Sequence, residues 1–239
     1  MRIALVGYGK MGKVIERIAL ERGHQIVAKV DWQNNDELVA LKPETVDVVI
    51  EFSSPEAAFQ NLSHCISAGL KVVCGTTGWL DKKPEIEELC RQNSRSAFFY
   101  ASNYSIGVNI FFKLNQMLAK LMQTQSQYEV TTTEIHHTEK KDAPSGTAIT
   151  LAEGIIDAYS LKNKWVSNEI PAANEVPIWS AREGKVPGTH VIKYISDVDQ
   201  IEISHEAYSR EGFALGAVVA AEWLQDKTGV QTMQEMLAL

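Results

Sequence analysis

The chain has few cysteines, no long basic run and no long apolar run. Its 239 residues include 23 Lys and Arg against 30 Asp and Glu, which gives a formal net charge of −7. Because nucleic-acid binding requires a basic patch or stripe, we expect no nucleic-acid partner. No apolar run approaches the ~20 residues that a membrane-spanning helix needs, and the first apolar run is too short for a signal peptide.

The three cysteines, Cys65, Cys74 and Cys90, are odd in number and widely spaced. This spacing matches neither a disulfide framework nor a paired metal or redox motif. We interpret them as small buried hydrophobic side chains in a reducing compartment. The sequence therefore predicts a cytoplasmic protein, and its 45% hydrophobic and 22% charged residues are typical of a globular one.

In the first hundred residues, short apolar runs alternate with amphipathic segments. Such alternation predicts a parallel sheet covered by helices. The apolar runs are rich in Val, Ile and Phe without alternation, as expected for strands buried on both faces. We predict strands at residues 3–6, 25–30, 46–52, 70–74 and 97–100, and helices at residues 10–22, 55–68 and 84–92.

After Asn103 the pattern changes to helical spacing mixed with longer β-rich runs. We predict helices at residues 108–122, 147–159, 213–224 and 232–237, and strands at residues 128–135, 190–195 and 200–205. The predicted fold is therefore α/β. A Rossmann-like domain, residues 1–104, precedes an α+β domain with a mixed sheet, residues 105–210.

A glycine-rich motif, Gly7-Tyr-Gly-Lys-Met-Gly12, follows the first predicted strand and opens a helix. The glycines allow a tight turn, close approach of the backbone to a pyrophosphate, and close helix–strand packing. The phosphates then lie on free amides of the helix N terminus. This context predicts dinucleotide binding, and the alternative is a glycine-rich turn in a flavodoxin-like domain. The candidate residues are Gly7, Tyr8, Gly9, Lys10, Met11 and Gly12.

Asp31 ends the second predicted strand, near the spacing of the carboxylate that binds the adenosine ribose. A carboxylate there repels a 2′-phosphate, and the next residue is Trp32 rather than Arg. We therefore expect NADH or NADPH as cofactor, with NADH favoured, although Lys10 could still neutralise a phosphate.

Two more strand ends carry small polar residues, and ligands of such sheets bind beyond the carboxyl ends of the strands. These residues could bond the nicotinamide or its ribose, and the alternative is ordinary turn chemistry. They are Gly75, Thr76, Thr77, Ala101, Ser102, Asn103 and Tyr104.

The segment from Glu134 to Thr147, EIHHTEKKDAPSGT, combines two imidazoles and two ammonium groups. Imidazole can pass a proton near neutral pH, and a lysine ammonium can donate one. When hydride adds to a conjugated imine, the neighbouring atom must receive a proton, and His136 or Lys140 meets that need. The alternative is a pair of surface or packed histidines.

Zinc is disfavoured here, because adjacent histidines do not have the four-residue ligand spacing of a His-Glu-x-x-His helix. We predict no metal. Residues Ser145, Gly146 and Thr147 begin a predicted helix, where backbone amides and a hydroxyl can bind a carboxylate. Helix capping by Ser145 is the simpler alternative, and both roles can hold together.

The motif His-His-x-x-Lys-x-Asp-Ala-Pro-Ser-Gly-Thr resembles the signature of the dihydrodipicolinate reductase family. Similar motifs lie at residues 75–78, 101–109, 182–190 and 201–210. The resemblance implies NAD(P)H-dependent reduction of dihydrodipicolinate to tetrahydrodipicolinate in lysine and diaminopimelate biosynthesis. It also implies a homotetramer assembled through the second domain, and helices at residues 211–239 that return to the first.

The resemblance implies that His136 is the proton donor and acceptor, and that Lys140 is a proton donor. His137, Gly146 and Thr147 match the substrate-binding residues. Two positions depart from the family pattern: the glycine loop is one residue shorter, with Lys10 before Met11, and Trp32 replaces a basic residue. Alternative functions are another nicotinamide-dependent amino-acid dehydrogenase, or a non-catalytic NAD(H)-sensing protein.

Overall fold

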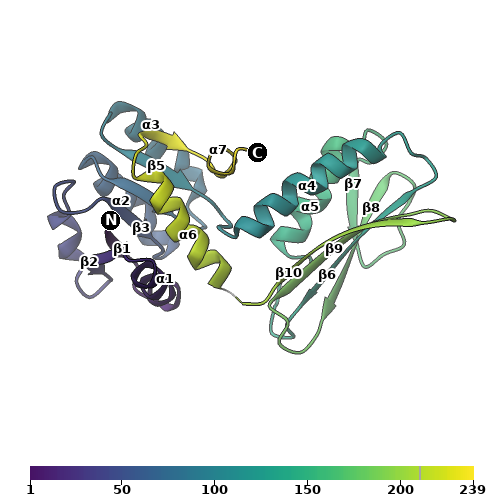
Figure 1. The fold of residues 1–239 in the computed structure, drawn as a ribbon, viewed down its shortest axis with the longest axis horizontal. Coiled ribbons are helices and arrows are strands. Elements are labelled where there is room, and N and C mark those ends of the chain that lie inside the picture. The colour runs from purple at the N-terminus through teal and green to yellow at the C-terminus, as the bar shows by residue number, and fades with distance from the viewer. Residues whose placement is uncertain (210) are drawn as a thin grey trace. The chain divides into compact units, whose positions relative to one another are not determined.

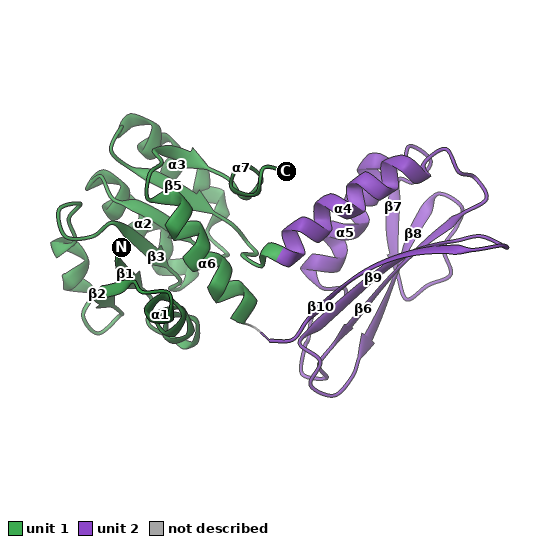
Figure 2. Cartoon of the chain, in the orientation of Figure 1, with its two compact units in different colours: residues 1–106, 211–239 green, residues 107–210 purple. Residues whose placement is uncertain are grey.

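The computed structural model describes residues 1–209 and 211–239 and divides the chain into two compact units (Figure 2). Unit 1 comprises Met1–Ile106 and Glu211–Leu239, and unit 2 comprises Gly107–Arg210. The last segment of the chain therefore returns to the unit in which the chain begins. Figure 1 labels the elements of each unit.

Unit 1 contains a parallel six-stranded sheet with the strand order β11-β5-β4-β3-β1-β2. The strands are β1 (Arg2–Val6), β2 (Gln25–Val30), β3 (Val48–Glu51), β4 (Lys71–Cys74), β5 (Ala97–Tyr100) and β11 (Gly229–Gln231). The inner strands are buried on both faces, as predicted. β2 differs: its residues alternate between more and less exposed, because it lies at the edge of the sheet.

Helices cover both faces of this sheet (Figure 1). They are α1 (Lys10–Glu21), α2 (Pro55–Ser67), α3 (Lys83–Gln92), α6 (Glu211–Leu224) and α7 (Met233–Leu237), with short 3₁₀ turns η1 (Asn35–Ala40) and η2 (Leu80–Lys82). Apolar residues of α1 and α6 form one core with the sheet, and those of α2 and α3 form a second. The sheet is thus sandwiched between two hydrophobic layers, as in doubly wound α/β domains.

Unit 2 contains a mixed five-stranded sheet with the order β10-β9-β6-β8-β7. The strands are β6 (Glu129–His136), β7 (Lys164–Ser167), β8 (Glu175–Arg182), β9 (Gly188–Ile195) and β10 (Gln200–Ala207). β9 pairs antiparallel with β6 and β10, whereas β8 runs parallel to β6 and β7. The mixed sheet predicted from the sequence is confirmed, although its strands β7 and β8 were not predicted. In unit 1, β11 was not predicted either.

Two helices, α4 (Ile106–Met122) and α5 (Gly146–Ala158), pack on one face of this sheet. Strand side chains alternate between faces, and in β6 the even-numbered residues from Val130 to His136 are buried. The opposite face carries more exposed apolar side chains, such as Trp179 and Ile195. The helix-covered face is the one that carries the candidate acid–base residues.

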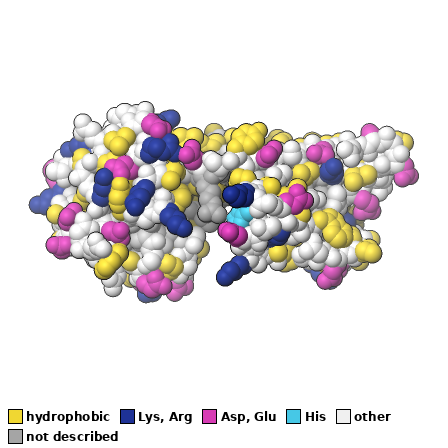
Figure 3. Space-filling view, turned by 90° about the horizontal axis from the view of Figure 1, so that it is seen from below, with side chains coloured by type: hydrophobic (Ala, Val, Ile, Leu, Met, Phe, Trp, Pro, Cys, Tyr) yellow, Lys and Arg dark blue, Asp and Glu magenta, His cyan; other side chains and the backbone are white. Residues whose placement is uncertain are grey.

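Figure 3 shows acidic and basic side chains mixed over the face that it presents. Among residues 1–209 and 211–239, no helix combines the length and the apolar character that crossing a membrane requires.

Candidate functional site

The glycine loop between β1 and α1 has the geometry that the motif predicted. Gly7 has a φ of +92°, and a Cβ atom there would lie 2.1 Å from the carbonyl oxygen of Phe52. A Cβ at Gly12 would lie 2.4 Å from the carbonyl oxygen of Gly7, whereas one at Gly9 would meet open space. Two glycines therefore allow tight packing, and the third leaves the backbone open to an approaching phosphate.

A cavity of about 560 Å³ opens beside this loop. The ends of β1, β2 and β3 contribute Gly7, Asp31 and Phe52 to its lining, at the carboxyl edge where α/β sheets bind ligands. Trp32 also lines the cavity, and 82% of its surface is exposed. The residues present thus fit a dinucleotide.

The charges near this cavity are largely paired. Lys29 forms an ion pair with Glu16 at 2.5 Å, and its ammonium lies 4.9 Å from the centre of the Tyr8 ring. Tyr8 also donates a hydrogen bond to Glu16. These contacts lower the pKa of Glu16, chiefly through Lys29, so its carboxylate remains paired with the lysine. Asp31 accepts a 2.8 Å hydrogen bond from the Trp32 amide.

The other predicted cofactor residues differ in how far their side chains can reach a ligand. Thr77 and Ser102 are exposed, and Lys10 is exposed at the start of α1. Thr76 is buried and accepts a 2.9 Å hydrogen bond from the Ser53 amide.

Tyr104 is buried in the core, and its hydroxyl donates to the carbonyl oxygens of Cys74 and Phe99. Its side chain therefore supports strands β4 and β5. Contact of Tyr104 with the cofactor stays a prediction.

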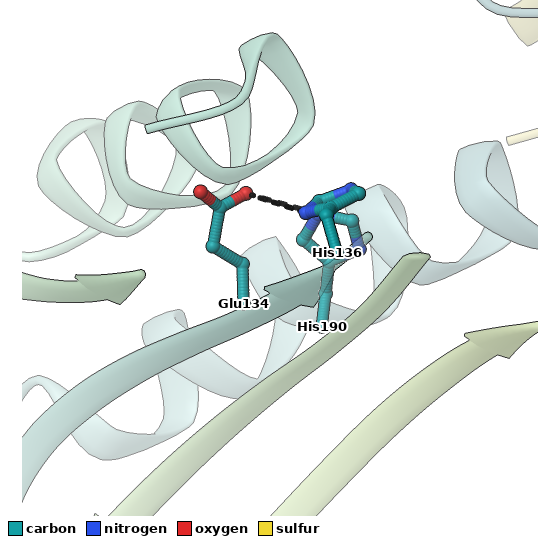
Figure 4. A group of neighbouring side chains, drawn as sticks. All are labelled: Glu134, His136 and His190. Carbon is teal, nitrogen blue, oxygen red and sulfur yellow. Dashed lines mark ion pairs between the residues drawn. The ribbon is translucent and has the colours of Figure 1, made fainter. Parts of the chain in front are cut away.

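In unit 2, three titratable side chains meet on the helix-covered face of the sheet: Glu134, His136 and His190 (Figure 4). Glu134 and His136 are two positions apart on β6, and Glu134 is in register with His190 on β9. His136 Nδ1 lies 3.3 Å and His190 Nε2 lies 3.8 Å from Glu134 Oε2. The shared strand face of Glu134 and His136, and the pairing of β6 with β9, thus place both imidazoles beside one carboxylate.

Glu134 is fully buried, yet its carboxylate has several donors. Its Oε1 atom accepts a 2.8 Å hydrogen bond from the Ser180 hydroxyl and lies 3.3 Å from the Arg182 guanidinium. Both carboxylate oxygens contact the Ser145 amide, at 3.1 and 3.2 Å. A buried charge is costly unless it is paired and hydrogen-bonded, and here it is both.

These contacts set the ionisation of the cluster. Burial raises the pKa of Glu134, but the donors His136, Ser145 and Ser180 together outweigh it, so the pKa lies well below its usual range. Burial and the neighbouring His136 lower the pKa of His190 to about 4. At neutral pH, Glu134 is an anion and His190 is a neutral imidazole.

Lys140 lies in the turn that follows β6. Its ammonium bonds both carboxylate oxygens of Asp142, at 2.9 and 2.8 Å. The Arg182 guanidinium donates to the carbonyl oxygens of Lys140 and Asp142, at 3.3 and 2.5 Å. One arginine therefore ties the Lys140 turn to the buried Glu134. His137 is half-buried, and its neighbour His136 is buried.

Ser145 is the N-cap of α5, and its hydroxyl accepts a 3.2 Å hydrogen bond from the Ala148 amide. The same hydroxyl lies 3.3 Å from His190 Nε2. The capping role predicted for Ser145 is confirmed. Gly146 is exposed and Thr147 is half-buried in the first turn, where backbone amides favour an anion.

Glu134, His136 and His190 have the residue types of a metal site, since their ligand atoms lie within 4.8 Å of one another. However, the Arg182 guanidinium already lies against Glu134. Its positive charge opposes a cation, and the donors around the carboxylate would have to be displaced. The donor set fits an acid–base cluster better than a metal centre, and we assign no metal role to it.

Three residues of this cluster were not identified as site residues from the sequence: Glu134, Arg182 and His190. The parity of β6 could have identified Glu134, because it shares a strand face with His136. Arg182 and His190 require the pairing of β6 with β8 and β9, which the sequence alone does not give.

Comparison with known proteins assigns the chain to a family. Residues 1–104 match the N-terminal domain of dihydrodipicolinate reductase, and residues 107–237 match its C-terminal domain. The chain belongs to the dihydrodipicolinate reductase family. The predicted family, fold class and enzyme class, an NAD(P)H-dependent oxidoreductase, are confirmed.

Relatives and a solved structure of this family match over nearly the full length of the chain. The chain is 51% identical to the 4-hydroxy-tetrahydrodipicolinate reductase of Christiangramia forsetii, covering 100% of this chain and 98% of that protein. It is 35% identical to that of Methanococcoides burtonii, covering 96% and 95%. The dipicolinate-bound dihydrodipicolinate reductase of Paenisporosarcina sp. TG-14 is 22% identical, covers 98% of each chain, and has a TM-score of 0.76, which supports the shared fold.

Proposed function

We propose that the chain reduces dihydrodipicolinate, formed by loss of water from 4-hydroxy-tetrahydrodipicolinate, to tetrahydrodipicolinate in lysine and diaminopimelate biosynthesis. The 51% identity with a reductase, over 100% of this chain and 98% of that protein, supports this function most strongly. The reaction consumes one NAD(P)H and one proton. The bound nicotinamide supplies the hydride, so this chain must bind the diacid, orient it and provide the proton.

We assign substrate binding to the first turn of α5 and the turn before it. The amides of Gly146 and Thr147 and the hydroxyl of Ser145 suit one carboxylate of the substrate. His137 and the ammonium of Lys140 suit the remaining polar groups. Lys140 is now paired with Asp142, and an entering carboxylate would compete with that exposed aspartate for the ammonium.

We assign proton transfer to the substrate to His136 and Lys140. Lys140 is partly exposed, and its ammonium can donate a proton directly to the atom that gains electron density. His136 is buried beside the anionic Glu134. We place it as the group that receives and returns protons during turnover.

For the cofactor, we propose that the ends of β1, β2, β4 and β5 hold NAD(P)H and that NADH is preferred. Asp31 lines the cavity as a carboxylate, and Trp32 offers no positive charge to a 2′-phosphate. Lys29 is already paired with Glu16. We expect Asp31→Ala to weaken NADH binding more than NADPH binding, as measured by KM for each cofactor. The opposite ranking would contradict the ribose-binding role of Asp31.

We further propose a cytoplasmic homotetramer. The sheet face of unit 2 that α4 and α5 leave uncovered presents Trp179 and Ile195, which suits burial against other copies of the chain. Three buried free thiols, Cys65, Cys74 and Cys90, suit a reducing compartment. Light scattering of the purified protein measures the number of copies.

The decisive experiment measures initial rates with enzymatically generated substrate and either NADH or NADPH. We expect substrate-dependent oxidation of the cofactor and competitive inhibition by pyridine-2,6-dicarboxylate, a planar analogue with both carboxylates. His136→Ala and Lys140→Ala should each lower kcat about 100-fold or more, as is typical of proton-transfer groups, while NADH still binds.

Each alternative function gives a different result in this assay. Turnover of aspartate or homoserine without turnover of dihydrodipicolinate would indicate another dehydrogenase. Tight NADH binding without any turnover would indicate a sensor. Wild-type rates in both variants would remove His136 and Lys140 from the mechanism.

A further inference from the structure

The buried Glu134 carboxylate connects parts of unit 2 that are far apart in sequence. It lies on β6 and contacts His136 on the same strand, His190 on β9 and Arg182 on β8. It also contacts the amide of Ser145, at the start of α5. Glu134 therefore contacts both the proposed proton-transfer histidine and the backbone of the proposed carboxylate-binding turn.

From these contacts we propose that Glu134 is a positioning residue, whose charge orients His136 for proton transfer and whose oxygens hold the substrate-binding turn of α5. This inference rests on the proposed function and extends it to a residue that does not itself contact the substrate. Carboxylates commonly fix the tautomer and the orientation of a functional histidine. Here the same carboxylate also fixes the helix start.

The contact between Glu134 and His136 defines what each ring nitrogen does. Nδ1 is the nitrogen that faces the carboxylate. Nε2 faces Gly188, where a Cβ would lie 3.0 Å away. With its proton on Nδ1, the neutral ring leaves Nε2 free to accept a proton, and the protonated ring can donate from Nε2.

The second role of Glu134 acts through Ser145. The Ser145 amide precedes the first turn of α5, and its hydroxyl caps that turn and contacts His190. Holding this amide on a buried anion fixes where the amides of Gly146 and Thr147 point. His190 is a neutral imidazole that packs against His136, with ring centres 5.1 Å apart. It supports the ring without adding a competing charge.

The test is Glu134→Gln, which keeps the size of the side chain and an acceptor for the Ser145 amide but removes the charge. Loss of an orienting partner typically lowers the activity of a histidine site about 10- to 100-fold, and we expect kcat to fall by that order. The substitution also removes the negative charge that lies 3.3 Å from His136 Nδ1. The pH–rate profile of the variant should therefore differ from that of the wild type.

Other charged groups near the cluster affect this pH profile and must remain unchanged in the comparison. Arg182 on β8, Lys140 in the turn after β6, and His190 and His205 on β9 and β10 surround it. None of them is altered by the substitution at Glu134. Glu129→Gln is the matched control, because this exposed carboxylate lies at the other end of β6 and pairs only with Lys162 among the described residues.

A second readout does not depend on turnover. The dissociation constant of pyridine-2,6-dicarboxylate, measured by calorimetry, should rise in Glu134→Gln because the α5 turn is less firmly held. The dissociation constant of NADH should not change, because the glycine loop belongs to unit 1. Glu129→Gln should match the wild type in both constants and in the pH profile.

Glu134→Asp is the second variant, and it tests the proposal by itself if Glu134→Gln does not fold. It retains the charge but withdraws the carboxylate by one methylene group. We expect kcat to fall while the pH–rate profile keeps its wild-type shape. Wild-type kcat and pH profile in the folded variants overturn the proposal, even when the wild-type enzyme is an active reductase. An inactive wild type would instead refute the proposed function itself.

Discussion

The ring of His136 and the backbone of Gly188 face each other across strands β6 and β9. A Cβ atom at position 188 would lie 3.0 Å from Nε2 and 3.3 Å from Cδ2 of that ring. Gly188 lies in a strand without a positive φ. The absence of a side chain at this position is therefore explained by the space that the imidazole needs, and not by the conformation of the backbone.

We predict that Gly188→Ala lowers kcat without a large loss of stability. The added methyl group must push the ring by a few tenths of an ångström. Displacement of a reacting group by about 1 Å can cost about 100-fold in rate, so we expect a fall of several-fold to tenfold. Steady-state kinetics and thermal unfolding measure the two effects.

The matched control for this prediction is Gly212→Ala in α6, where, among the described residues, a Cβ would meet only the Ser105 hydroxyl oxygen, at 3.8 Å. This variant should keep the wild-type kcat. If Gly188→Ala also keeps the wild-type kcat, the position of the His136 ring does not limit turnover.

Among the elements, β8 contributes the side chain that organises the turn after β6. Arg182, its last residue, donates to two carbonyl oxygens of that turn and lies against Glu134. Its planar guanidinium can serve these three acceptors at once, whereas a lysine ammonium is a compact point charge. The turn that carries Lys140 is thus held by a neighbouring strand.

We predict that Arg182→Lys raises the substrate KM and speeds amide hydrogen exchange in residues 137–144, because the turn loses its carbonyl contacts. NADH binding should be unaffected. Exchange measured by mass spectrometry, together with KM, tests this effect. Arg91→Lys is the control, since Arg91 makes only exposed ion pairs on α3 among the described residues. Unchanged exchange in residues 137–144 would contradict the proposed role of Arg182.

The sequence predicted most elements of the fold, because their hydrophobic patterns are strong. β8 was missed for a physical reason: it contains Pro177, which argues against a strand inside a sheet, and yet it lies between β6 and β7. β7, with the sequence KWVS, has only two apolar residues, and β11 is three residues long, so neither forms a clear apolar run.

Some residues of the candidate site could be predicted from the local sequence, and others could not. The glycine loop and the His136 segment are local in sequence, so their residue types indicate their chemistry directly. Arg182 and His190 join Glu134 only through strand register. Tyr104 lies in a polar motif, yet its side chain is buried in the core, which the local pattern did not indicate.

At the scale of the whole molecule, a chain of net charge −7 must bind an anionic cofactor and a dianionic substrate. Its cations near both sites are largely paired: Lys29 with Glu16, and Arg182 with Glu134. Lys140 is likewise paired with Asp142, so helix N termini supply much of the local attraction. Because such attraction is short-range and screened by salt, we infer that recognition depends on contact rather than on long-range steering.

Two titrations within unit 2 also make the stability of the molecule depend on pH. His190 has a folded-state pKa of about 4, below the usual 6.5, because of burial and the nearby His136. Below pH 6.5 the unfolded chain gains a proton that the folded chain does not take up, so stability falls as pH drops from 6.5 to about 4. Glu134 has a lowered pKa, and its contribution is present at neutral pH and is lost only at more acidic pH.

We predict that the free energy of unfolding decreases by up to about 3 kcal/mol between pH 6.5 and pH 4, since each pKa unit corresponds to about 1.36 kcal/mol. The lowered pKa of His205 acts in the same direction. His190→Gln removes the larger titration and should flatten this part of the curve while leaving the steeper loss at lower pH that belongs to Glu134. Urea unfolding, monitored by circular dichroism, measures the free energy of unfolding of the wild type and of His190→Gln at each pH. Parallel curves for His190→Gln and the wild type above pH 4 would mean that His190 is not held neutral in the folded molecule.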